Sequence, residues 1–165
     1  MPLIPPYLIV EEPPQEARQV DGDILHKLLK KVSPSAYKHL KKHKIEPVLY
    51  MTEWFMCLFT RTLPWSSVLR VWDMFFFCEG VKVLLRVGLV ILKYGLRSQV
   101  LKQCPGLYGT LQALRNIDHG VMAEGFLLFQ MQRLDLSEDD LQREHQRQVQ
   151  KRRQAAAKDA SANGR

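Results

Sequence analysis

The stretch SVLRVWDMFFFCEG, residues 67–80, decides how this chain folds. It is dominated by Trp72 and by three consecutive phenylalanines, yet Arg70 and Asp73 bracket the tryptophan closely. A helical reading gathers the large apolar side chains on one broad face and leaves Arg70 and Asp73 three residues apart, within reach of each other. We therefore expect a core-facing helix that ends at Gly80, the natural residue for a helix C-terminus.

Two hypotheses account for the charges beside Trp72. Arg70 and Asp73 are either a catalytic couple or an ion pair that covers the edge of a buried helix. Charges beside a buried tryptophan are usually satisfied by structural partners, which favours the second hypothesis.

Helical periodicity continues on both sides of this stretch. Residues 21–32 carry an apolar face, which consists of Ile24, Leu25, Leu28, Leu29 and Val32. Further helices are expected over 36–44, 48–62, 81–102, 106–117 and 121–134, and from Ser137 onward. No strand-like alternation and no internal repeat is visible. The predicted class is all-α, with about seven helices.

The two ends of the chain differ from its middle. Residues 1–20 are proline-rich and are predicted to be an irregular leader, whereas 21–143 form the domain. Residues 144–165 are predicted to be a basic, alanine-rich tail that is partly disordered. Because this tail has almost no apolar stripe, we expect it to project or fray rather than pack.

Composition excludes several classes of protein. The 165 residues, 46% hydrophobic and 25% charged, suit one globular domain. The cysteines at 57, 78 and 104 lack metal or disulfide spacing and are predicted to be reduced thiols. The longest apolar run is interrupted by Lys82, Arg86 and Lys93, so no integral membrane segment is expected.

The formal net charge of +7 raises the question of nucleic-acid binding. Basic residues concentrate in 38–44 and 142–158, on helix-like segments without interleaved aromatic residues or a docking motif. This pattern indicates a solvated basic face, and no nucleic-acid partner is expected.

The remaining candidate sites have structural explanations. His39 and His43 have helical i, i+4 spacing, but lysines rather than further metal ligands surround them. Trp54 and its aromatic neighbours have the spacing of a packed core, and Cys57 within that cluster lacks a cation to activate it. The residues therefore predict no catalytic, cofactor-binding or metal-binding side chain, and no cofactor.

Residues 46–96, EPVLYMTEWFMCLFTRTLPWSSVLRVWDMFFFCEGVKVLLRVGLVILKYGL, resemble the C-terminal half of the TBC domain of Rab GTPase-activating proteins. In detail they resemble most the member 10 subfamily, and the similarity runs from about Val20 through Arg143. The motif residues that carry it are Trp54, Arg70, Trp72, Asp73, Glu79 and Gly80. The resemblance implies an all-α lobe in which these residues are scaffold.

The resemblance also implies a mechanism that this chain does not carry in full. TBC proteins insert an arginine from an IxxDxxR motif and a glutamine from a YxQ motif into the nucleotide site of the GTPase. None of the five tyrosines is followed by glutamine at the spacing of the YxQ motif. The segment most similar to the IxxDxxR motif, DDLQR at 139–143, lacks the apolar residue with which that motif begins. The chain is therefore expected to be inactive alone.

Two departures accompany the resemblance. Met1 falls near the middle of such a domain, which fits an alternative start, a truncated gene model or a genuine half-domain. The third phenylalanine in DMFFFCEG is one more than the subfamily leads us to expect. An extra residue rotates a helix by about 100°, so we expect the Glu79-Gly80 turn to absorb it.

The resemblance implies a member of the Rab GTPase-activating family that regulates small GTPases of vesicle traffic. Its expected partner is a Rab-type small GTPase, and its expected location is the cytoplasm or the periphery of membranes. The alternative is a non-catalytic interaction module or truncated product that pairs with another TBC lobe or with itself. A third class, a membrane scaffold acting through residues 147–153, lacks the necessary apolar face.

Overall fold

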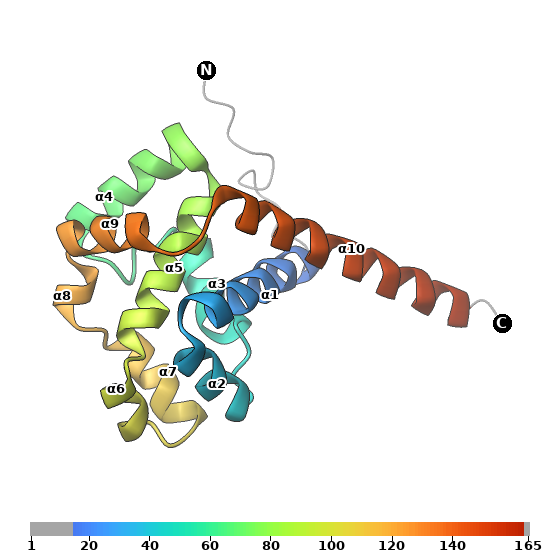
Figure 1. Ribbon diagram of the computed structural model, residues 1–165, viewed down its shortest axis with the longest axis horizontal. Coiled ribbons are helices and arrows are strands. Elements are labelled where there is room, and N and C mark those ends of the chain that lie inside the picture. Colours follow the sequence, from blue (N-terminus) through green and yellow to red (C-terminus); the bar gives the residue numbers. More distant parts are fainter. Residues whose placement is uncertain (1–14, 164–165) are drawn as a thin grey trace.

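The computed structural model describes residues 15–163; residues 1–14 and 164–165 lie outside this description. Over the described range the chain is helical and contains no strand, which confirms the all-α prediction (Figure 1). The elements are α1 (Gln15–Val32), α2 (Pro34–Lys42), α3 (Val48–Met56), α4 (Trp65–Met74), the π-helical segment η2 (Phe75–Glu79), α5 (Val81–Gly95), α6 (Ser98–Gln103), α7 (Leu107–Arg115), α8 (His119–Met122), α9 (Glu124–Arg133) and α10 (Glu138–Asn163).

The elements are more numerous than the seven or so expected. The segment predicted as one helix over 81–102 divides into α5 and α6, and the four-residue helix α8 precedes α9. The helix predicted over 48–62 ends at Met56, and left-handed backbone at Leu58 and Phe59 follows it. Short helices and turns of this kind leave little periodicity to read in a sequence.

Helix α5 forms the centre of the fold. Its residues from Val83 to Leu92 are buried except for Arg86, and it contacts α1, α3, α4, α7, α8 and α9. Gly88 permits close approach, because a Cβ atom there would lie 3.4 Å from Leu25 of α1 and 3.7 Å from the ring of Trp54 of α3. A helix that is apolar around most of its circumference belongs in the interior.

Helix α1 begins earlier than the sequence suggests. The irregular leader was predicted to reach residue 20, but α1 starts at Gln15, directly after Pro14. Proline is disfavoured within a helix but compatible with its start, so the helix can begin immediately after the proline-rich segment. The rest of the predicted leader, residues 1–14, lies outside the described residues.

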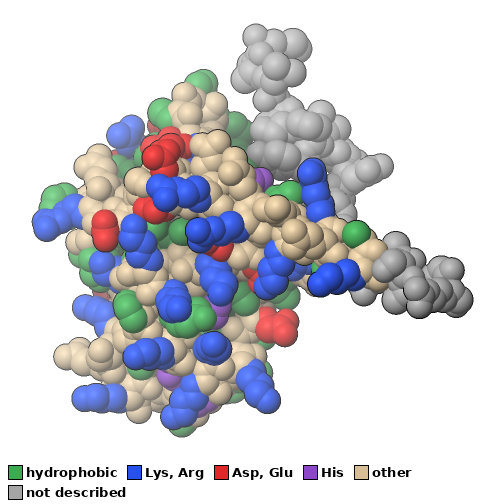
Figure 2. Space-filling view, turned by 45° about the vertical axis from the view of Figure 1, so that its right-hand side comes forward, with side chains coloured by type: hydrophobic (Ala, Val, Ile, Leu, Met, Phe, Trp, Pro, Cys, Tyr) green, Lys and Arg blue, Asp and Glu red, His purple; other side chains and the backbone are tan. Residues whose placement is uncertain are grey.

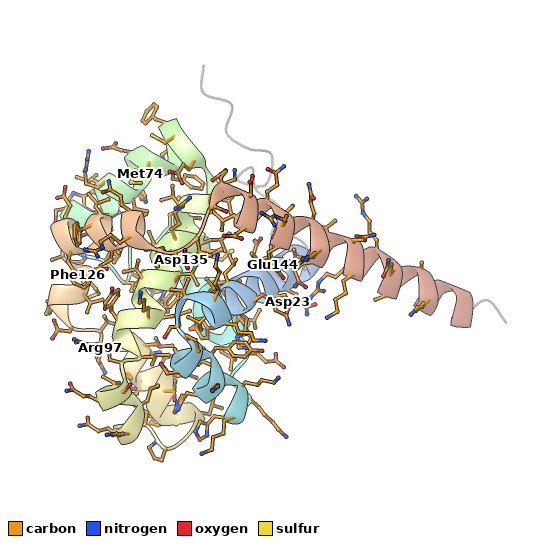
Figure 3. The ribbon with its side chains drawn as sticks, viewed as in Figure 1. Asp23, Met74, Arg97, Phe126, Asp135 and Glu144 are labelled. Atoms are coloured by element: carbon orange, nitrogen blue, oxygen red, sulfur yellow. The ribbon has the colours of Figure 1, made fainter. Side chains whose placement is uncertain are left out.

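Helix α10 runs antiparallel to α1, and this corrects the prediction for the tail. Lys31 bonds Asp140 at 2.8 Å near one end of the pair, and Arg152 lies 3.0 Å from Asp23 near the other. Gln148 is only 4% exposed, and its amide donates to Glu144 at 2.6 Å. Figure 3 labels Asp23 on α1 and Glu144 on α10, near each other where the two helices run side by side. Residues 144–152 therefore pack.

The packing of α10 escaped prediction because its contact stripe is polar. Glu144, Gln148 and Arg152 recur every four residues, the spacing of one helix face. Beyond them the last turns of α10 extend away from the other helices, as expected (Figure 1). Within residues 15–163, no helix combines the length and the hydropathy needed to cross a bilayer.

Candidate functional site

The six motif residues lie on α3, α4 and η2 and at the turn before α5. Trp54 of α3 is 3% exposed and stacks on Phe59, with 5.7 Å between the ring centroids. Trp72 of α4 is partly buried, and its indole N–H donates to the carbonyl of Leu58 at 3.1 Å. Both tryptophans therefore contact the turn that joins α3 to α4.

Arg70 and Asp73 form an ion pair on the surface of α4. Arg70 Nη1 lies 3.9 Å from Asp73 Oδ2, and its Nε lies 3.4 Å from Glu124 Oε1 at the start of α9. The side chains of Arg70 and Asp73 are both more than half exposed. The pair lies at the edge of the helix and bridges to α9, so the scaffold hypothesis describes it better than a catalytic couple.

All three consecutive phenylalanines lie in a π-helical segment that follows α4. Phe75–Glu79 is π-helical, a form of helix with i→i+5 hydrogen bonds that fits an additional residue into a turn. Gly80 follows with φ 59° and ψ −137°, a conformation that side chains disfavour. Gly80 ends the helix, as predicted, and the absorption of an extra residue by Glu79-Gly80 stays a prediction.

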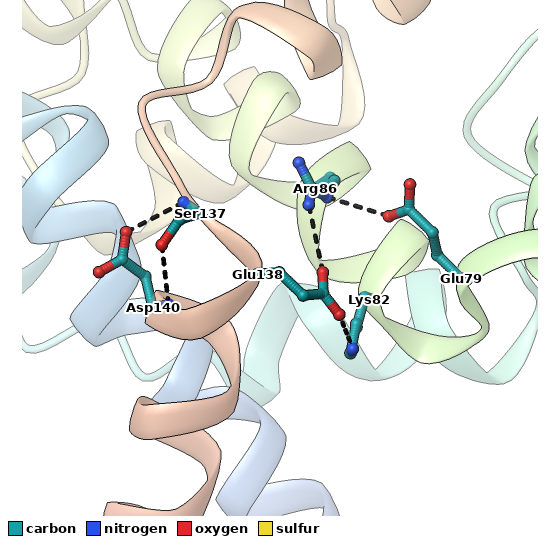
Figure 4. Close-up of polar contacts among 6 residues, drawn as sticks. All are labelled: Glu79, Lys82, Arg86, Ser137, Glu138 and Asp140. Atoms are coloured by element: carbon teal, nitrogen blue, oxygen red, sulfur yellow. Dashed lines mark hydrogen bonds and ion pairs between the residues drawn. The ribbon is translucent and has the colours of Figure 1, made fainter.

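Glu79 belongs to a charged cluster that joins three elements (Figure 4). Its carboxylate lies 3.2 Å from Arg86 Nε on α5, and Arg86 Nη2 lies 3.6 Å from Glu138 at the start of α10. Lys82 pairs with the same Glu138 carboxylate. Only 16% of the Arg86 side chain is exposed, so these acidic partners compensate its partial burial.

The same end of α10 carries a reciprocal cap. Asp140 N–H donates to Ser137 Oγ at 3.1 Å, while Ser137 N–H donates to Asp140 Oδ2 at 3.0 Å. The hydrogen bond from Lys31, followed by those from Ser137, holds the pKa of Asp140 well below its usual range. The cap fixes where α10 begins relative to α1 and α5.

An exposed apolar ridge runs along α4 and η2. We call this surface the α4 ridge; it consists of Trp65, Leu69, Trp72, Phe76 and Phe77. The exposed fractions of Trp65 and Phe77 are 62% and 79%, and those of Leu69 and Phe76 are 43% and 47%. The Trp72 ring meets those of Trp65 and Phe76 edge-on, at 5.9 and 6.4 Å. Large aromatic side chains exposed together mark an interaction surface.

A second surface feature lies between α3, the turn after it and α7. It is an open depression of about 720 Å³. Its lining residues are Leu49, Thr52, Glu53, Trp54, Met56, Cys57, Arg61, Thr62, Leu114 and Arg115. Arg61 Nε lies 3.3 Å from Glu53 Oε1, so this arginine is paired within the chain.

The remaining candidate residues have structural contacts. His39 Nε2 lies 2.8 Å from Thr110 Oγ1, and its ring meets that of His43 at 4.5 Å. Burial lowers the pKa of His39. Among the described residues no cluster of three metal-binding side chains occurs, and Cys57, Cys78 and Cys104 carry free thiols.

Sequence reasoning did not identify the acidic partners of this region. Glu124 and Glu138 lie far along the chain from Arg70 and Arg86, and only the folded arrangement brings them together. The Leu58 carbonyl that accepts from Trp72 is a backbone atom and leaves no sequence signal.

Comparison with known proteins gives the class to which this helical lobe belongs. The sequence profile of the Rab-GTPase-TBC domain matches residues 10–101. The chain is 59% identical over 131 residues to TBC1 domain family member 10A of Mus musculus, an overlap that covers 79% of this chain and 26% of that protein. It is 47% identical over 154 residues to TBC1 domain family member whacked of Drosophila melanogaster, which covers 92% and 42% respectively.

Carabin of Mus musculus is 44% identical over 133 residues, covering 80% of this chain and 30% of carabin. The chain therefore belongs to the Rab-GTPase-TBC domain family, as its motif residues indicate. It spans less than half the length of each of these relatives.

Proposed function

We propose that this chain regulates Rab-type small GTPases of vesicle traffic in the cytoplasm, with residues 21–143 as the C-terminal part of a TBC domain and 144–165 as its tail. Membership of the Rab-GTPase-TBC family is the observation that carries this proposal. The proposed role is to contribute a binding surface for the GTPase or for the rest of a TBC domain.

The chain alone does not accelerate GTP hydrolysis in this proposal. An arginine supplied in trans raises the hydrolysis rate by about 10³- to 10⁵-fold, provided that its guanidinium reaches the transferring phosphate. Arg61, Arg70 and Arg86 each have acidic partners within the chain. The sequence also contains neither the IxxDxxR nor the YxQ motif.

The alternative function is a non-catalytic module that pairs with another TBC lobe or with a second copy of the chain. The α4 ridge favours this alternative, because Trp65 and Phe77 are mostly exposed and would gain burial against a partner. Both functions use a binding surface, and they differ in whether a GTPase occupies it.

Single-turnover GTP hydrolysis by a panel of Rab proteins tests the proposal, with this chain in excess and a complete TBC domain as the positive control. We expect a rate equal to the intrinsic rate of each Rab, together with binding of at least one GTP-loaded Rab in a pull-down. An increase of a hundredfold or more in the GTP hydrolysis rate of any Rab would overturn the proposal that the chain alone is inactive. If no Rab in the panel bound the chain, the proposal of a GTPase partner would be overturned, and the alternative of a module that pairs with another TBC lobe or a second copy would stand.

A further inference from the structure

One segment of this chain carries a block of positive charge that no acidic residue interrupts. Residues 24–45 contain seven lysines but no aspartate, glutamate or arginine. All seven lysines are exposed, and they are Lys27, Lys30, Lys31, Lys38, Lys41, Lys42 and Lys44. Their number equals the formal net charge of the entire chain, so the rest of the sequence is close to neutral.

Helix α2 directs its lysines away from the core. Ala36 and Leu40 are fully buried and define the inner face of the helix. At about 3.6 residues per turn, Lys38, Lys41 and Lys42 lie on the opposite face. The outer face of α2 is therefore an uninterrupted cationic surface.

An exposed apolar tip stands next to α2. The contact of 2.8 Å between His39 and Thr110 holds the first turn of α7 against α2. That turn begins with Leu107 and Tyr108, whose exposed fractions are 44% and 82%. Exposed Lys102 belongs to α6, which also contacts α2. The exposed aliphatic and aromatic side chains of this turn therefore stand on an element that contacts the lysine-bearing helices α2 and α6.

The two features share one end of the molecule. Figure 1 places α2, α6 and α7 at its lower end, opposite α4. Figure 2 shows Lys and Arg side chains spread over this lower end, with hydrophobic side chains between them, while acidic side chains are concentrated higher up. The surface is distinct from the α4 ridge, and the inference about it is independent of the proposed function.

We propose that this end of the chain binds the surface of an anionic lipid bilayer, with Leu107 and Tyr108 entering the interfacial region and the α2 lysines contacting the headgroups. Tyrosine favours the membrane interface, where its ring is shielded and its hydroxyl stays hydrated. Lysines near an anionic leaflet each add attraction, and stable attachment requires two signals of this kind.

The residue types favour a bilayer over a nucleic acid. Between Arg18 and Arg61 every fixed cation is a lysine, whereas specific phosphate and base recognition favours the planar guanidinium of arginine. Tyr37, the only aromatic residue on α2 that bases could stack on, packs on His26 with Lys41 over its ring. A diffuse lysine face with an apolar tip matches a lipid surface instead.

The test is co-sedimentation of the full 165-residue chain with vesicles of neutral phosphatidylcholine or with vesicles that also contain about 30 mol % phosphatidylserine. The first variant is the triple change Lys38→Gln, Lys42→Gln and Lys44→Gln. Its matched control removes three exposed charges from α10 through Arg143→Gln, Lys151→Gln and Arg153→Gln. Tyr108→Ser tests insertion, with Phe129→Ser on α9, at a position 52% exposed, as its control.

We expect binding to the anionic vesicles alone, and a loss on the order of tenfold or more in the variant with the three lysine substitutions at 38, 42 and 44. Tyr108→Ser should weaken binding several-fold, whereas both controls should bind like the unchanged chain. Equal binding to neutral vesicles, or an equal loss in the α10 control, would overturn the proposal. Binding of duplex DNA without binding of vesicles would assign the surface to a nucleic acid and would likewise overturn it.

Discussion

The indole N–H of Trp72 donates a hydrogen bond to the carbonyl of Leu58 across 3.1 Å. Leu58 and the following Phe59 have φ values of 46° and 62°, a left-handed conformation that such side chains rarely adopt. The bond from α4 and the stacking of Phe59 on Trp54 hold this unfavourable backbone in place. Trp72 is thus the residue that connects the end of α3 to the packing of α4.

Trp72→Phe should destabilise the chain by about 1–2 kcal/mol, because the aromatic ring is retained while the Leu58 carbonyl loses its donor. Trp72→Ala should cost more, about 3 kcal/mol, because the ring contacts are also lost. Urea unfolding followed by circular dichroism measures both. Trp65→Phe, at a position 62% exposed, is the control and should be nearly neutral. If Trp72→Phe and Trp65→Phe lost similar amounts of stability, the role of the hydrogen bond from Trp72 would be contradicted.

Gly80→Ala should reduce the free energy of unfolding by about 1–3 kcal/mol through backbone strain. No atom lies within 4 Å of the position of the added Cβ, so a steric clash cannot account for the loss. Gly106→Ala is a matched control, since the space there is equally open but φ is −161°. Thermal unfolding of the two variants should separate them clearly, and equal stabilities would show that the π-helical end tolerates a side chain.

Asp21 of α1 makes stability depend on pH. Burial raises its pKa to about 6, although the charge of His145 opposes this shift. In the unfolded chain the carboxyl has its ordinary pKa near 3.8, so the folded state binds the proton more tightly between these values. Stability from this group is therefore lost as pH rises from about 4 to 6.

Asp21→Asn removes that pH dependence. The variant should match the unchanged chain near pH 4 and exceed its stability at pH 7 by about 1–3 kcal/mol, since one pKa unit corresponds to about 1.4 kcal/mol. Urea unfolding at the two pH values gives the comparison. If Asp21→Asn were less stable than the unchanged chain at pH 7, the proposed effect of burial on Asp21 would be refuted.

Arg152→Ala should loosen α10 from α1. The guanidinium bonds both Gln19 and Asp23, at 2.8 and 3.0 Å, and it is partly exposed. The expected loss of global stability is therefore only about 0.5–1 kcal/mol. Hydrogen exchange should nevertheless accelerate across residues 145–155, while Arg153→Ala at the neighbouring exposed position leaves it unchanged. Unaltered exchange in the first variant would mean that other contacts hold the helix.

The α4 ridge should drive self-association of the isolated chain, because exposed apolar patches of this kind commonly do so. Replacing Trp65 and Phe77 together by serine should lower the binding of the dye ANS to the chain. It should also shift the sedimentation coefficient toward that of the monomer. Phe129→Ser, at a position 52% exposed on α9, is the control and should change neither measurement. A chain that is already monomeric and binds no ANS would contradict this prediction.

The sequence by itself determined the helical class, the family and part of the core, whereas the expected core-facing side of residues 67–80 is partly exposed, with Leu69 at 43% and Phe76 at 47%. Ile24, Leu25 and Leu29 recur with the period of one helix face, and such local periodicity persists whatever the partner of the helix is. The end of the α4–η2 helix at Gly80 could also be predicted from the sequence, because a single glycine residue determines it. Local causes leave local signals.

Tertiary structure alone decided which charges meet. Arg152 and Asp23 are 129 positions apart, and no periodic pattern in either helix announces their contact. The burial of Gln148, the bridge from Arg70 to Glu124 and the left-handed turn at Leu58 likewise depend on elements distant in the chain. A polar contact stripe looks like a solvated face until its partner is in place, because burial is a property of the packed helices together.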